Sequence, residues 1–428
     1  MQYSNIFVIL FFIGTFLNFF LDMILEGIDY SFRKKHGTEI PAEIEGLIDK
    51  ATLERTCAYE NAKYKFWIPK VVVSLALNLY LMVSGFYPAV FETVCLWTGN
   101  SVLANLLFIF FTSIPGTILS IPFSLYSTFG IEKQFGFCKQ TFGTWIADGI
   151  KSFLVAVVIA VPLLAVASLL FKHFPDFWWL LLGSVYVAFS LLLSIIYPLF
   201  IAPIFNKFTP LEEGELKERL EKLLKSCGFK SSGLFVMDAS RRSGHSNAYF
   251  TGFGKSKRVV LYDTLIEQLS TDEIEAVLAH ELGHYKHRHI LKKLLTMIPL
   301  IFAVLFAISF IIKLPSLYEG FGFQILTNED GSISHKMMMV GLIFSGTVFG
   351  GFSPVASLVS NFLSRKDEFQ ADAFSAKTCG AKNLISALIK LNKENLSEIQ
   401  VPKIYSVFNY NHPPLLERIE SCRKAENA

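Results

Sequence analysis

The chain has 428 residues, of which 52% are hydrophobic and only 18% charged, and its mean hydropathy is +0.45. This composition is too apolar for an average soluble protein and predicts an integral membrane protein. The formal net charge of +3 is small, and we expect no nucleic-acid partner. The six cysteines are scattered with no C-x-x-C spacing, so we expect reduced thiols rather than a disulfide framework.

Seven apolar runs approach or exceed the roughly 20 residues that cross a bilayer as a helix. They cover residues 6–25, 67–91, 102–129, 153–171, 178–204, 294–312 and 337–363. The first run lacks a basic start and a small-residue cleavage site, so we expect a retained helix and not a signal peptide. The third and fifth runs contain prolines, which mark either ordinary kinks or places where a wet cavity satisfies the freed carbonyls. These are Pro115, Pro122, Pro198 and Pro203.

Lysine and arginine gather in the segments that follow spans one, three, five and seven, whereas the other connections carry few of them. By the positive-inside rule the basic segments are cytoplasmic, which places the N-terminus outside or in the lumen and the C-terminus in the cytoplasm. We therefore divide the chain into spans one to five (1–204), a polar segment (205–293), spans six and seven (294–363) and a polar C-terminal segment (364–428). Both polar segments share one face and can build one site.

Three short stretches in the first polar segment read as strands separated by turns: 234–238, 247–252 and 258–262. We expect them to form a small antiparallel sheet. A free sheet edge can hold an extended peptide by adding it as another strand, and residues 244–249, which include Asn247, are the candidate edge. The alternative is a plain hairpin.

The sequence STDE at 270–273 predicts a capping box at the start of an amphipathic helix. On this helix His280 and His284 lie four residues apart and therefore on one face, which suits two imidazole nitrogens on a single Zn²⁺. Glu281 lies beside them, where it can act as the general base. The alternative is a solvated helix with incidental histidines.

His287 and His289 follow on the same stretch. A third histidine ligand of the metzincin type would need Gly at position 287 and His at position 290, where this chain has His and Ile. We expect both residues to belong to a basic cytoplasmic collar before span six.

A catalytic zinc site keeps three protein ligands and one open position, so a third ligand must come from elsewhere. The best candidate is Glu368, which follows span seven together with Asp372, four residues later on the same helix face. Asp372 would then either steady a histidine ligand or donate a proton to the departing amine. The alternative is a juxtamembrane helix with ordinary surface acids.

His412 precedes two prolines and an amphipathic helix near the C-terminus. Either Asn411 or His412 caps the helix, since proline suits the first helical turn, or His412 is a rigidly held group that steadies an oxyanion.

With these residues assembled, the chain resembles the type I CAAX prenyl proteases over nearly its whole length. The matching motifs are HELGH (280–284), EFQADAF (368–374), HSNAYFTGF (245–253), FGFCKQT (135–141) and HPPLLER (412–418). The resemblance implies that His280, His284 and Glu368 bind zinc, that Glu281 is the base and Asp372 assists. It also implies that the region of Asn247 and the side chain of His412 contact the substrate.

The resemblance further implies a mainly α fold, with seven long membrane helices around a water-filled chamber and a cytoplasmic α+β zinc protease domain. The polar residues Asn18, Asn78 and Asn105 would then face water instead of lipid. The expected protein is a monomeric zinc metalloendopeptidase with one Zn²⁺ per chain. It would contact membrane lipid and cut peptide or protein substrates of the CAAX type, prenylated or not, in the endoplasmic reticulum membrane of a eukaryote or the cytoplasmic membrane of a bacterium.

Two other functions stay open from the sequence. A membrane quality-control protease of the heat-shock type shares HExxH but needs no prenylated substrate. A transporter or channel with a structural zinc belongs to a different class, and structural zinc sites are usually closed by four Cys or His ligands.

Overall fold

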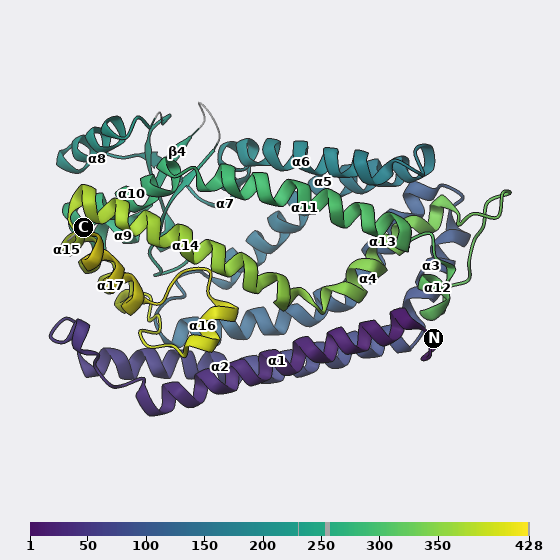
Figure 1. Cartoon of the computed structure of the whole chain (residues 1–428), viewed down its shortest axis with the longest axis horizontal. Coiled ribbons are helices and arrows are strands. Elements are labelled where there is room, and N and C mark those ends of the chain that lie inside the picture. The colour runs from purple at the N-terminus through teal and green to yellow at the C-terminus, as the bar shows by residue number, and fades with distance from the viewer. Residues whose placement is uncertain (230, 253–256, 427–428) are drawn as a thin grey trace.

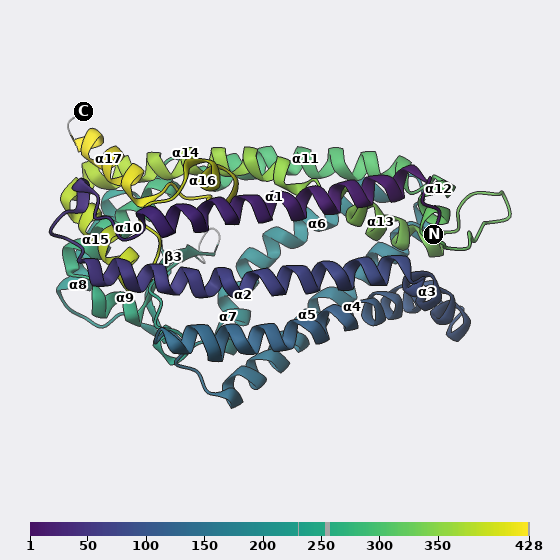
Figure 2. The same ribbon diagram turned by 90° about the horizontal axis from the view of Figure 1, so that it is seen from below.

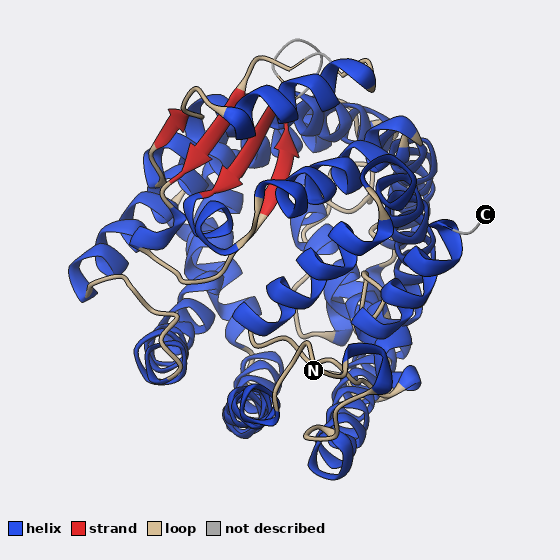
Figure 3. Cartoon of the chain, turned by 90° about the vertical axis from the view of Figure 1, so that its left-hand side faces the viewer, coloured by secondary structure: helices blue, strands red, loops and turns tan. Residues whose placement is uncertain are grey.

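The computed structural model describes residues 1–229, 231–252 and 257–426. Long helices run side by side along one axis of the molecule, and a small sheet lies at one end among shorter helices (Figures 1–3). The helices of the first half are α1 (Ile6–His36), α2 (Lys50–Val83), α3 (Phe86–Trp97), α4 (Ser101–Leu125), α5 (Phe142–His173), α6 (Trp178–Ile196) and α7 (Ala202–Phe205). Those of the second half are α8 (Glu215–Ser226), α9 (Asp263–Gln268), α10 (Thr271–Lys286), α11 (His289–Ile311), α12 (Pro315–Gly320), α13 (His335–Gly350), α14 (Ser353–Cys379), α15 (Ala381–Glu394), α16 (Lys403–Asn409) and α17 (Leu415–Glu426).

Six described helices are long and apolar enough to span a membrane, and α13 with α14 forms a further candidate pair that is bent by 72°. The mainly α, multi-span fold class is therefore confirmed, but two spans differ from the prediction. The second span begins earlier, as part of α2, and ends before Gly85, whose φ of 78° breaks the helix. The seventh is not one straight helix, because Gly350 and Gly351 are followed by a proline at the start of α14.

Two of the proline-containing spans end in π-helical turns. Pro115 and Pro122 lie inside α4, which continues into the turn Tyr126–Glu132. The turn Tyr197–Ile201 follows α6 and contains Pro198. Proline lacks the N–H of an i→i−4 bond, and the π-helical turns lie at or shortly after Pro122 and Pro198.

The sheet is mixed and has four strands, so the prediction of an antiparallel sheet was wrong. Its strand order is β1 (Phe208–Pro210), β2 (Leu234–Met237), β4 (Arg258–Tyr262), β3 (Ala248–Thr251). β2 and β4 are parallel, because the chain crosses from one to the other through β3 and the loops around it, whereas the outer pairs are antiparallel. β3 pairs with β4 alone among the described strands, so it is an edge strand.

Two hydrophobic cores lie at different ends of the molecule. One packs the starts of α1 and α4 against α3, α12 and α13, with Phe11, Phe108 and Trp178 almost fully buried. The other lies under the sheet and contains Leu220 and Leu261. Tight packing at both ends leaves the middle of the helical cage free to be hollow.

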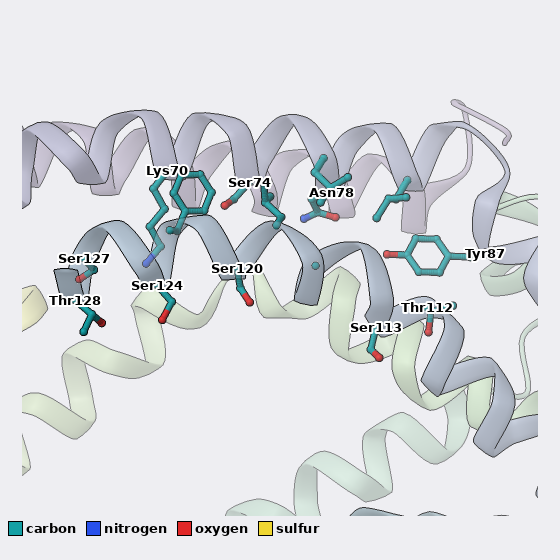
Figure 4. A pocket seen from close by; sticks show the side chains of 15 residues that line it. Lys70, Ser74, Asn78, Tyr87, Thr112, Ser113, Ser120, Ser124, Ser127 and Thr128 are labelled. Atoms are coloured by element: carbon teal, nitrogen blue, oxygen red, sulfur yellow. The ribbon is translucent and has the colours of Figure 1, made fainter. Parts of the chain in front are cut away.

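Polar cavities occupy that middle region. A cavity of about 590 Å³ lies between α2 and α4 and is lined by many small polar side chains, with Ser74, Asn78 and Ser120 among them (Figure 4). A second cavity, of about 390 Å³, reaches α1 and shares Ser74 and Asn78 with the first. Asn18 lines the second, so two of the three predicted asparagines do border a cavity. Asn105 does not: it is 1% exposed and donates a hydrogen bond to Ser168 on α5.

Candidate active site

The metal helix α10 begins as predicted, at a capping box. The Ser270 hydroxyl accepts a hydrogen bond from the Glu273 backbone N–H, and the Glu273 carboxylate accepts one from the Ser270 N–H. The other interactions of Glu273 are with Ser386 and Lys390 on α15. The same residue that starts the helix therefore also attaches it to the C-terminal segment.

Gly283 lets α10 approach α14 closely. A Cβ at this position would lie 2.7 Å from the Cα of Ala371, closer than real Cβ contacts. The glycine of HELGH is thus required by helix packing, and the close approach brings the α14 carboxylates to the two histidines of α10.

Three predicted ligands converge on one point. The Nε2 atoms of His280 and His284 are 3.3 Å apart, and they lie 3.4 and 3.3 Å from the two carboxylate oxygens of Glu368. Donors at the zinc distances of about 2.0–2.1 Å in a tetrahedron are separated by about 3.3 Å. All three residues belong to a group whose ligand atoms lie within 4.8 Å of one another.

One of the donor atoms has no hydrogen-bond partner among the described residues. Glu368 is 4% exposed, and its Oε2 makes no hydrogen bond with acceptable angles, although His412 Nδ1 lies 2.8 Å away. A buried carboxylate oxygen without a partner is costly unless a cation neutralises it. The residues present therefore fit a divalent metal ion with nitrogen and oxygen ligands.

Asp372 orients His280 from behind. Its Oδ1 lies 2.8 Å from His280 Nδ1, which fixes the proton on that nitrogen and leaves the Nε2 lone pair facing the metal position. Arg418 of α17 donates two hydrogen bonds to the same carboxylate, at 2.9 and 2.7 Å. Because Asp372 is fully buried and held on both sides, this geometry favours orientation of His280 over proton donation. The sequence analysis did not single out Arg418, although it ends the HPPLLER motif.

His289 is not part of an exposed collar, so that prediction was wrong. It is 1% exposed, and its Nδ1 lies 2.9 Å from Nδ1 of His284. Its Nε2 faces Gln370 on α14 at 3.0 Å. His289 therefore contacts Nδ1 of the second histidine ligand, His284, just as Asp372 contacts Nδ1 of the first, His280. His287 is exposed, in agreement with the prediction. No sequence signal distinguishes His289 from His287, because both lie in the same basic stretch before an apolar run.

Glu281 lies in the same turn of α10 as the two histidines, half-buried at the site. Burial raises the pKa of Glu281, and positive charge on His280 and His284 opposes that shift. A carboxylate with a raised pKa is a stronger proton acceptor than an ordinary surface acid.

His412 joins the site through its contact with Glu368. Its ring is 59% exposed, so the face away from Glu368 is open to a ligand. Helix α17 begins at Leu415, so neither Asn411 nor His412 is its N-cap, and the capping interpretation is wrong.

Asn247 lies immediately before the edge strand β3. Its backbone carbonyl accepts a hydrogen bond from Tyr262 N–H on β4, and its side chain is exposed. β3 in turn packs against α10, so the sheet edge and the histidine helix are neighbours. The structure brings six of the seven predicted site residues to the metal position or next to it and places Asn247 at the adjoining edge.

A histidine pair on one helix, completed by a carboxylate from a helix that enters the apolar cage, defines a class of protein: the membrane metallopeptidases. Comparisons with known proteins agree. Residues 29–207 match a model of the CAAX prenyl protease N-terminal region with five membrane helices, and residues 210–426 match peptidase family M48. The chain belongs to peptidase family M48 and is a multi-pass membrane metalloprotease that acts on peptide or protein substrates.

Its similarity to individual relatives covers nearly the full length of each. It is 38% identical over 400 residues to CAAX prenyl protease 1 homolog of Oryza sativa, covering 91% of both chains. It is 37% identical over 406 residues to CAAX prenyl protease 1 of Saccharomyces cerevisiae, covering 91% of this chain and 89% of that one. The crystal structure of S. mikatae Ste24p matches with a TM-score of 0.89 and 32% identity, covering 96% of this chain and 99% of that one.

Proposed function

We propose that this metalloprotease uses one Zn²⁺, held by His280, His284 and Glu368, to hydrolyse peptide bonds near the C-terminus of prenylated CAAX-type substrates. The observation that carries the zinc assignment is the convergence of three ligand residues: the two Nε2 atoms are 3.3 Å apart, and each lies 3.3–3.4 Å from one of the two Glu368 carboxylate oxygens. The substrate assignment is supported by the names of relatives at 33–38% identity.

Zinc at this site would polarise the scissile carbonyl and lower the pKa of a water toward about 7. Glu281 takes the proton from that water as it attacks the carbonyl carbon and then passes it to the departing amine. Asp372, held by Arg418, keeps the His280 ring in one tautomer throughout. His412 donates a hydrogen bond to the carbonyl oxygen as negative charge develops there, using the ring nitrogen that does not face Glu368.

The substrate lies extended along β3, where unpaired backbone groups of the edge strand form hydrogen bonds with it. Asn247 contacts the peptide at the end of this strand. The protease domain (205–293) and the C-terminal segment (364–428) face the cytoplasm, and the N-terminus faces the lumen or outside. We place the protein in the endoplasmic reticulum membrane of a eukaryote or the cytoplasmic membrane of a bacterium, as a monomer.

The test compares two peptides, one farnesylated at its CAAX cysteine and one unprenylated, and identifies the products by mass spectrometry. We expect cleavage next to the modified cysteine, and faster turnover of the farnesylated peptide. Equal cleavage of both peptides and of an unfolded membrane protein would instead support a quality-control protease. A metal ion closed by four protein ligands would support the structural-zinc alternative.

A further inference from the structure

A second charged cavity, of about 370 Å³, lies between α1, α2 and the segment 397–410 that leads to His412. Four carboxylates line it, from Glu26, Asp29, Glu60 and Glu398, against two cationic side chains, Arg33 and Lys63. The cavity therefore carries an excess of negative charge. It is separate from the metal ligands and has no role in the mechanism above.

The two cations do not neutralise all four acids. Arg33 pairs with Asp29 at 2.8 Å and with Glu398, and Lys63 pairs with Glu60 at 2.8 Å. Glu26 has no ion-pair partner among the described residues and accepts a hydrogen bond only from the Tyr405 hydroxyl. Burial, together with the charge of Asp29, raises the pKa of Glu398 to about 7.

One residue that lines the cavity has an unpartnered buried oxygen. Asp29 lines it and is 2% exposed, yet its Oδ1 has no hydrogen-bond partner. A buried carboxylate oxygen normally has a donor, because leaving it unpaired costs about 1–3 kcal/mol or more. This atom is thus an acceptor without its donor.

Aromatic rings complete the lining. Tyr64, Trp67, Tyr405 and Tyr410 border the cavity, and the Tyr405 and Tyr410 rings meet edge to face at 5.9 Å. Aromatic rings beside carboxylates favour an organic cation, because cation–π attraction adds to the ionic attraction.

The cavity wall is joined to the metal site. Arg365, one turn before Glu368 on α14, donates a hydrogen bond to the Tyr410 carbonyl at 2.7 Å. His412, whose ring contacts Glu368, is only two residues beyond Tyr410, which is at most about 7 Å of chain. The Tyr410 wall of the cavity is therefore connected to the metal site by direct contacts and a short stretch of chain.

We infer that this cavity binds the ammonium or guanidinium group of a basic side chain of the substrate, several residues from the cleaved bond. The inference rests on the proposed function, which decides on which side of the cleaved bond the basic residue lies. Only three residues follow the cysteine of a CAAX sequence, so the basic residue must lie upstream of it.

The test uses farnesylated peptides that carry either lysine or its uncharged analogue norleucine at single positions two to seven residues upstream, with the full-length enzyme in nanodiscs. We expect a kcat/KM about three- to tenfold higher for lysine at one or two of these positions, mainly through KM. In Glu26→Gln, which keeps the acceptor for Tyr405, that preference falls toward one while norleucine peptides are cleaved at the wild-type rate. Glu54→Gln is the control, because Glu54 is exposed on the same helix as Glu60 and does not line the cavity.

Binding of the same peptides to the zinc-loaded Glu281→Gln enzyme is measured in parallel. Equal affinity for lysine and norleucine peptides, or a preference that persists in the Glu26→Gln background, overturns the cavity assignment. If Glu26→Gln weakens the binding and cleavage of both peptides equally, the assignment is also overturned, because Glu26 then has a purely structural role. If the wild-type enzyme cleaves neither peptide but still binds the lysine peptide more tightly, only the proposed function is overturned.

Discussion

Two clusters of buried charge lie on the same side of this molecule and differ in how they are satisfied. Around the metal position, two histidines and Glu368 aim unshared electron pairs at one point, and Asp372 and Arg418 support them from behind. Around Asp29, carboxylates surround a cavity bordered by aromatic rings, with no histidine among its lining residues. Similar amounts of charge therefore prepare one cluster for a metal ion and the other for an organic cation, because the donor types and their convergence differ.

The largest expected effect is a loss of cleavage without a loss of zinc, at the cluster around the metal position. Glu281→Gln removes the proton acceptor and keeps the size of the side chain, so we expect cleavage to fall by about 10²–10⁴-fold. Zinc content, measured by elemental analysis of the purified protein, should stay at one per chain. Retained activity would show that another group is the base.

Removing a metal ligand should abolish tight zinc binding, which is the property that distinguishes the first cluster from the second. Glu368→Gln supplies a weaker, neutral ligand and should lower zinc affinity by more than about 100-fold, beyond the loss typical of supporting residues. Chelation of the wild-type enzyme should abolish cleavage, and added Zn²⁺ should restore it. Glu398→Gln is the control from the other cluster and should keep full zinc content.

The supporting ion pair comes next in size. Asp372→Asn weakens the hold on His280 Nδ1 and leaves Arg418 buried without its anion, so we expect a 10–100-fold loss of zinc affinity. Zinc competition with a fluorescent chelator measures it. If Asp372 were instead the proton donor, kcat would fall at saturating zinc while the affinity stayed unchanged.

Much of this site could be predicted from local sequence patterns. The i, i+4 spacing placed His280 and His284 on one face, and the same spacing paired Glu368 with Asp372, because helical geometry fixes those relations within a few residues. The mixed sheet, the pairing of Asn105 with Ser168 and the role of Arg418 could not be predicted in this way. Each depends on which distant segments pack together, and no local period carries that information.

His289 shows most clearly where the prediction failed and gives the smallest of the expected effects. In sequence it is equivalent to His287, since both lie in a basic stretch that precedes an apolar run. The chain turns at Arg288, whose φ is 56°. The rings of His287 and His289 stack, but His287 is exposed, whereas His289 is buried and faces His284 and Gln370. We expect His289→Gln to lower zinc affinity by about tenfold, the lower end for residues that orient a ligand, and His287→Gln to leave it unchanged. Chelator competition on the two variants side by side measures the difference, and equal affinities would return His289 to the basic collar that the sequence suggested.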